Sequence, residues 1–137
     1  MSTSNVTLII VGLNVKSVQK VRPEFDEAAY GKIVESMKKL DQFSNLTYHI
    51  VQLDTEAPAE DANSIEGFYR QLHNKSWSAV LIGGGIRALA PMTQLLEEIV
   101  NEIARSSSGK TKILFSADGS DHQSVMLRHF PELNAST

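Results

Sequence analysis

Residues 6–13 read VTLIIVGL, and this stretch decides the fold of the chain. It is short, continuously apolar and rich in β-branched residues, and it ends beside Gly12. A strand with an unbroken apolar run, rather than an alternating pattern, is buried on both faces, as in a parallel sheet. The stretch therefore predicts a central strand of an α/β domain.

Three more strand segments follow, each separated from the next by a helical segment. Residues 46–53 (LTYHIVQL) alternate in part, which is typical of a strand nearer the edge of a sheet, and residues 78–82 (SAVLI) and 112–116 (KILFS) are again apolar. Four helical segments are indicated: residues 26–40, the stripe Ile65, Phe68, Tyr69 and Leu72, a helix beginning near Pro91, and a last helix that begins with the capping-box pattern of residues 120–123. Residues 14–22 are expected to be a polar connection.

The repeated strand–helix order predicts a three-layer α/β/α fold with a four-stranded parallel sheet. Right-handed crossover connections favour the strand order 2-1-3-4. Residues 1–137 contain no internal repeat or linker, so a single α/β domain is expected. The fourth strand would form an exposed edge, which proteins tend to cover, and we therefore expect a homodimer.

Composition excludes several classes of function. The net charge of −3 argues against a nucleic-acid partner, and no cluster of Lys and Arg suits a membrane surface. The apolar run of residues 8–11 is too short to span a membrane or to form the core of a signal peptide. The absence of cysteine rules out thiol catalysis and disulfides, and it fits a reducing compartment, so a cytoplasmic protein is expected.

A ligand site is expected at the carboxyl ends of the first and third strands, where the strand order reverses. Asn14 follows the first strand, and the segment GGGIRALAP follows the third. Gly83, Gly84 and Gly85 allow a ligand to approach the backbone, and Arg87 can pair with a phosphate or carboxylate. The structural alternative is that the glycines serve a tight turn and that Asn14 is a turn residue.

The loop after the fourth strand, FSADGSD, borders the same crevice. Ser116 and Asp118 are expected to complete the ligand site, and Asp118 with His122 forms a candidate acid–base pair. The alternative is that residues 118–121 simply form a turn and a helix start. His122 and His129 lie about two helical turns apart, too far for one metal ion, so no metal site is expected. No catalytic residue or cofactor can be assigned.

Over nearly the whole chain the pattern resembles flavodoxin-like domains, including response-regulator receivers. A receiver implies acidic residues after the first strand and a phosphate-accepting Asp after the third, where this chain has residues 12–14 (GLN) and 83–85 (GGG). A flavodoxin implies a phosphate loop after the first strand, which residues 14–17 do not match. Gly83, Gly84 and Gly85 also lack the G-x-G-x-x-G spacing of a Rossmann dinucleotide site. The chain is therefore expected to be Rossmann-like in its architecture but not in its ligand. The stretch VLIGGGIR, with KILFS after the next helix, also resembles small bacterial and fungal α/β proteins, which imply no activity for this chain.

Two functions remain open. The chain is either a domain that binds a small anionic ligand, or a non-catalytic module for protein interaction or dimerisation. The glycine segment and Arg87 at the expected switch point favour ligand binding. Whether the chain is an enzyme does not follow from its sequence.

Overall fold

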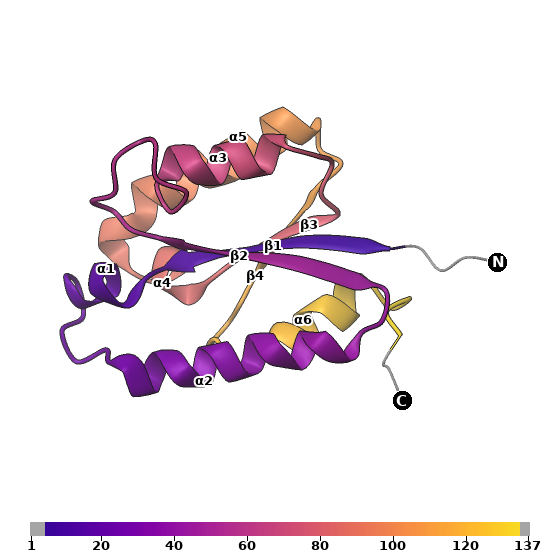
Figure 1. Ribbon diagram of the computed structural model, residues 1–137, viewed down its shortest axis with the longest axis horizontal. Helices are drawn as coiled ribbons and strands as arrows, with labels where there is room; N and C mark the ends of the chain where they lie inside the picture. The colour runs from indigo at the N-terminus through magenta and orange to yellow at the C-terminus, as the bar shows by residue number, and fades with distance from the viewer. Residues whose placement is uncertain (1–4, 135–137) are drawn as a thin grey trace.

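Four parallel strands form one sheet in the computed structural model, which describes residues 5–134. The strands are β1 (Val6–Leu13), β2 (Leu46–Leu53), β3 (Ala79–Ile82) and β4 (Lys112–Phe115). They lie in the order β2-β1-β3-β4 (Figure 1), which confirms the order expected from right-handed crossovers. β2 and β4 are the two edges, and all eight residues of β1 pair with β2.

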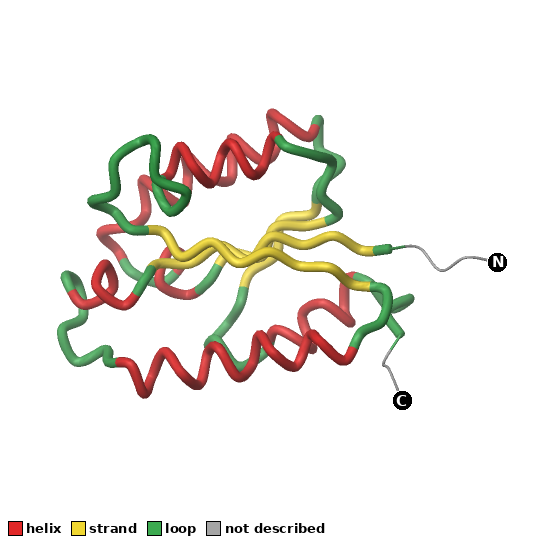
Figure 2. The backbone as a smooth tube through the Cα atoms, in the orientation of Figure 1, coloured by secondary structure: helices red, strands yellow, loops and turns green. Residues whose placement is uncertain are grey.

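Helices cover both faces of the sheet (Figure 2), as expected for a three-layer α/β fold. α3 (Ile65–His73) and α5 (Thr93–Ser107) pack on one face, and α2 (Glu27–Lys38) and α6 (His122–His129) pack on the other. Two short helices, α1 (Val15–Gln19) and α4 (Gly84–Arg87), lie at the carboxyl ends of β1 and β3. The 3₁₀ turns η1 (Lys39–Gln42) and η2 (Ala90–Met92) adjoin α2 and α5.

β1 is buried on both faces, as its apolar run predicts. Ile9 and Val11 belong to the core under α3 and α5, whereas Leu8 and Ile10 belong to the core under α2 and α6. The alternation follows from the two-residue period of a strand, which sends successive side chains to opposite faces. β1 is therefore the element that joins the two cores.

Side-chain caps account for where the longer helices begin. Asp26 accepts a hydrogen bond from the Ala29 amide at 2.8 Å, and Ser64 accepts one from the Gly67 amide at 2.9 Å. Helix α5 ends where Ser108 takes a left-handed conformation with φ of 52°. The helices predicted over 26–40 and from near Pro91 are thus confirmed, the second with η2 as its first turn.

The connection predicted over residues 14–22 is wrong in one respect, because it contains helix α1. Asn14 caps this helix by accepting a hydrogen bond from the Ser17 amide at 2.9 Å. Ser17 is buried, and its hydroxyl accepts a hydrogen bond from the Thr55 amide at 3.1 Å, which ties α1 to the loop after β2. None of the helices in residues 5–134 combines the length and the apolar character needed to cross a membrane.

Candidate functional site

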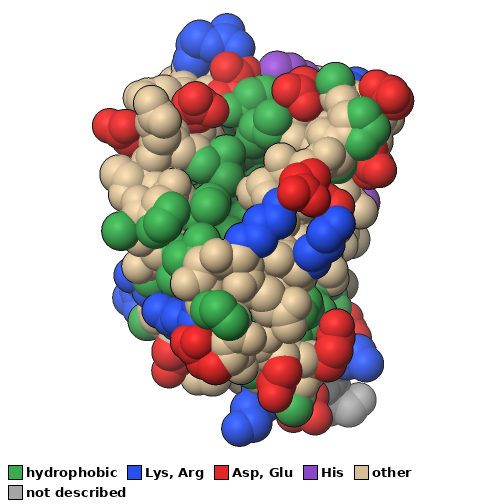
Figure 3. All heavy atoms as spheres, turned by 90° about the vertical axis from the view of Figure 1, so that its left-hand side faces the viewer, with side chains coloured by type: hydrophobic (Ala, Val, Ile, Leu, Met, Phe, Trp, Pro, Cys, Tyr) green, Lys and Arg blue, Asp and Glu red, His purple; other side chains and the backbone are tan. Residues whose placement is uncertain are grey.

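A cavity of about 230 Å³ opens at the carboxyl ends of β1 and β3. This is where the strand order reverses, the position expected for a ligand site in an open α/β sheet. Figure 3 views this end of the molecule, where apolar side chains form a hollowed strip bordered by charged residues. Residues from the β1–α1 segment, α2, the β3–α5 segment and the β4–α6 loop line the cavity.

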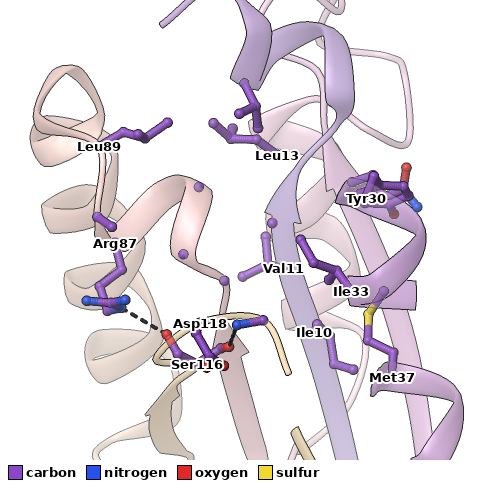
Figure 4. Close-up of a pocket in the computed structure, with 18 of the residues that line it drawn as sticks. Ile10, Val11, Leu13, Tyr30, Ile33, Met37, Arg87, Leu89, Ser116 and Asp118 are labelled. Atoms are coloured by element: carbon purple, nitrogen blue, oxygen red, sulfur yellow. Dashed lines mark hydrogen bonds between the residues drawn. The ribbon is translucent and has the colours of Figure 1, made fainter. Parts of the chain in front are cut away.

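Six of the seven predicted site residues border this cavity: Gly83, Gly84, Gly85, Arg87, Ser116 and Asp118. The exception is Asn14, whose side chain caps α1. Figure 4 shows Arg87 and Leu89 on one side of the space and Tyr30, Ile33 and Met37 of α2 on the other. The structure therefore brings the predicted residues together and adds a wall from α2.

The glycine segment forms helix α4 rather than an open loop. Gly83 precedes its first turn and donates from its amide to the Val11 carbonyl at 2.8 Å, which continues the sheet. A Cβ at Gly85 would lie 3.4 Å from Val18 and 3.5 Å from Leu13, which are ordinary van der Waals contacts, so the packing of α4 against α1 does not require a glycine there. A Cβ at Gly84 would meet no atom within 4 Å, because the backbone there borders the cavity. Neither glycine is required by packing, and the open space at Gly84 fits the expectation that a ligand can approach the backbone there.

Arg87 binds two backbone carbonyl groups of the β4–α6 loop. Its Nε donates to the Ser116 carbonyl at 3.0 Å, and its Nη2 donates to the Ala117 carbonyl at 2.7 Å. Neither bond uses Nη1. The guanidinium thus fixes the loop to α4 (Figure 4) and adds positive charge beside the cavity.

The β4–α6 loop is held by its own side chains. The Ser116 hydroxyl donates to Asp121 Oδ1 at 2.7 Å and accepts from the Gly119 amide at 2.9 Å. Asp121 Oδ2 accepts from the Ala117 amide at 2.9 Å. The capping box predicted over residues 120–123 is wrong, because Asp121 begins α6 with its carboxylate turned back to the loop. Gly119 adopts φ of 81°, as a turn glycine does.

Asp118 and His122, the candidate acid–base pair, make no hydrogen bond to each other within residues 5–134. Asp118 Oδ1 accepts from the amide and the hydroxyl of Ser120 at 2.9 and 2.7 Å, and these bonds lower the pKa of its carboxyl. His122 is buried, and its Nδ1 lies 2.7 Å from the hydroxyl of Ser36 on α2. Burial lowers the pKa of the imidazole, and the nearby Asp121 and Asp118 oppose that shift. The imidazole is therefore held in its neutral form near pH 7.

The wall contributed by α2 was missed as part of the site. Tyr30, Ile33 and Met37 lie in the segment 26–40, for which the sequence predicts only a helix. Their helical spacing indicates an apolar face in contact with the core. The Tyr30 hydroxyl is buried and has no hydrogen-bond partner within residues 5–134. Burial, and then the charge of Glu27, raise the pKa of Tyr30, so the phenol keeps its proton. An unpaired buried hydroxyl beside a cavity is a polar group that a ligand can satisfy.

The cavity combines a mainly apolar lining with a small number of polar groups, which is the usual composition of a small-molecule site. No arrangement within residues 5–134 brings three His, Asp or Glu side chains together to hold a metal ion. No protein-family model matches this chain, and neither a curated protein nor a solved structure is significantly similar to it.

Proposed function

We propose that this chain binds a compact amphipathic ligand in the cavity at the carboxyl ends of β1 and β3. The apolar body of the ligand lies against Ile33, Met37 and Leu13. Its phosphate or carboxylate group lies beside Arg22 and Arg87, which also line the cavity. The observation that carries the proposal is the cavity itself, an apolar recess at the switch point of the sheet.

The size of the cavity limits the ligand. Its volume of about 230 Å³ lies below the range of roughly 300–1,000 Å³ that is typical for drug-sized ligands. This favours a compact acid over a nucleotide or a flavin. Burial of about 100 Å² of apolar ligand surface would contribute about 2.5 kcal/mol, so the apolar lining supplies much of the affinity.

Charge favours a negative group at one end of the ligand. Arg22 and Arg87 both border the cavity, and the exposed guanidinium of Arg22 makes a 3.6 Å ion pair with Glu24. Arg87 keeps Nη1 outside its two bonds to the loop. An anion there would gain a charge-assisted hydrogen bond without disturbing the contacts of Arg87.

A thermal-shift screen with compact aromatic and branched aliphatic carboxylates and phosphates tests the proposal. Gly84→Val is the informative variant, because its side chain extends into open space beside the cavity instead of clashing with the protein. Gly31→Val is the matched control, since Gly31 also has open space around it but does not line the cavity. A ligand at 100 times its Kd stabilises by about 2.7 kcal/mol, which raises Tm by several degrees.

We expect at least one compound to raise Tm of the wild-type protein and of Gly31→Val, but not of Gly84→Val. An equal shift in all three proteins would place binding elsewhere and contradict the proposal. Arg87→Ala is a poorer test, because the variant also releases the β4–α6 loop.

We also propose, as the second candidate function, self-association through the β4 edge. β4 is an edge strand, and Phe115 at its end is 39% exposed, so apolar surface and unpaired backbone lie together. Analytical ultracentrifugation of wild-type protein and Phe115→Lys tests this candidate. A wild-type dimer that dissociates in Phe115→Lys supports self-association through β4. A wild-type protein that stays monomeric at about 100 µM contradicts it.

A further inference from the structure

His122 borders the cavity although only 2% of the residue is exposed. It begins α6, directly after the loop that Arg87 holds. A buried polar ring that touches a largely apolar cavity has desolvated hydrogen-bonding atoms, and these atoms interact more strongly with a ligand than the same atoms in water. His122 has no part in the arginine-based anion contact proposed above.

Ser36 fixes which ring nitrogen of His122 carries the proton. The Ser36 hydroxyl oxygen lies 2.7 Å from Nδ1 and 3.4 Å from the backbone nitrogen of His122. The backbone N–H can only donate, so the hydroxyl oxygen accepts there. That oxygen has a second lone pair, but within residues 5–134 the hydroxyl hydrogen has no acceptor other than Nδ1, and leaving a buried hydroxyl hydrogen unpaired is costly. Nδ1 is therefore the acceptor, and the proton of the neutral ring lies on Nε2.

Nε2–H is the hydrogen-bonding atom of His122 that remains for a ligand. Within residues 5–134 it donates to no other residue. It is also not one of the fully buried polar atoms that lack a hydrogen-bond partner. His122 borders the cavity, and Ser36 holds Nδ1, so the ring cannot rotate without losing the Ser36 bond. The donor is thus pre-positioned, which reduces the entropy cost of binding.

The charges near His122 select a neutral acceptor. Asp118 lines the cavity, and Asp121 directly precedes His122, so two carboxylates lie close to the ring. A negatively charged ligand group at Nε2 would be repelled by both carboxylates, whereas a carbonyl oxygen accepts the hydrogen bond without added charge. The negative group of the ligand belongs beside the arginines, and a neutral oxygen belongs at His122.

We propose that His122 anchors the ligand by donating from Nε2 to a carbonyl oxygen. This inference rests on the proposed function and narrows its ligand class. The ligand is a compact acid whose apolar body separates a carboxylate or phosphate from a carbonyl group. His122 is a binding residue in this account, and Ser36 is the residue that positions it.

A pair of nearly isosteric probes tests this anchor. 4-Acetylbenzoate carries the carbonyl oxygen, and 4-isopropenylbenzoate replaces that oxygen by a methylene group of similar shape. The Kd of each is measured by NMR titration of the wild-type protein, with the methyl groups of Ile33 and Met37 as reporters. We expect 4-acetylbenzoate to bind about fivefold more tightly, which is the effect of one hydrogen bond.

Variants identify the donor. His122→Phe should bind the two probes equally, and His122→Gln, which keeps a side-chain N–H, should restore part of the preference. Ser36→Ala should also reduce the preference, because the ring is then no longer held in the Nε2–H form. Ser36→Ala provides the test if His122→Phe does not fold.

The outcomes separate this inference from the function on which it rests. Equal wild-type affinities for the two probes would overturn the His122 anchor and leave the proposed binding function standing. A preference for 4-acetylbenzoate that persists in both Ser36→Ala and His122→Phe would also overturn the anchor. Failure of both probes to shift the cavity methyl groups would overturn both proposals for compact aromatic acids.

Discussion

Replacing Arg87 by alanine tests the inference that the guanidinium holds the β4–α6 loop. The variant removes the bond from Nε to the Ser116 carbonyl at 3.0 Å and the bond from Nη2 to the Ala117 carbonyl at 2.7 Å. The hydrogen bond to Ser116 is partly buried, and the hydrogen bond to Ala117 is exposed. Hydrogen bonds from a charged group contribute about 1.5–3 kcal/mol when buried, and less in water, so we expect a loss of about 2–3 kcal/mol in the free energy of unfolding.

Urea unfolding measures this loss, and hydrogen exchange locates it. The Gly119 amide donates to the Ser116 hydroxyl at 2.9 Å inside the loop, so its protection should fall in Arg87→Ala. Arg105→Ala is the matched control, because Arg105 is exposed and, within residues 5–134, its side chain pairs with Glu102 alone, on its own helix. This variant should lose about 0.5 kcal/mol or less. Equal losses in the two variants, with the Gly119 amide still protected, would refute the inference that Arg87 holds the β4–α6 loop.

Three further predictions concern glycine positions and pH. Gly67→Ala should lose about 1–3 kcal/mol in urea unfolding, because the new Cβ would lie 2.4 Å from the Asp61 carbonyl oxygen, and unchanged stability would contradict that contact. Gly31→Ala should gain about 0.5–1 kcal/mol, because Gly31 lies inside α2 with open space around it, and a loss would contradict the helix there. The lowered pKa of His122 means that the unfolded state takes up a proton first as the pH falls. Stability should therefore decrease as the pH falls below about 6.5 and through the folded pKa, and His122→Gln should flatten this dependence in pH-stepped unfolding; an unchanged slope would contradict it.

The architecture could be predicted because local patterns determine it. The apolar run of β1 requires burial on both faces, and the handedness of crossover connections leaves few strand orders. The place of the site followed from the same topology, since the carboxyl ends of β1 and β3 must flank the switch point. Six predicted residues border the cavity for that reason.

The contacts inside the site could not be predicted, because they join residues that are far apart in the chain. Arg87 is 29 residues from Ser116, and Ser36 is 86 residues from His122. The apolar stripe of α2 gave no sign that Met37 would line a cavity as well as the core, because periodicity identifies a face and not what lies against it. The cap formed by Asn14 was missed although Asn is a common helix N-cap residue, because the five residues of α1 are too few to show a helical apolar period.

The most direct test of ligand binding in the cavity is methyl NMR of the wild-type protein with compact aromatic and branched aliphatic acids. Met37 and Leu89 line the cavity, and Leu72 and Ile103 lie in the core under α3 and α5 as internal references. We expect saturable shifts at Met37 and Leu89 and little change at Leu72 and Ile103. These shifts should be lost in Gly84→Val but not in Gly31→Val. Shifts confined to other surfaces, or none with any compound, would contradict ligand binding in the cavity.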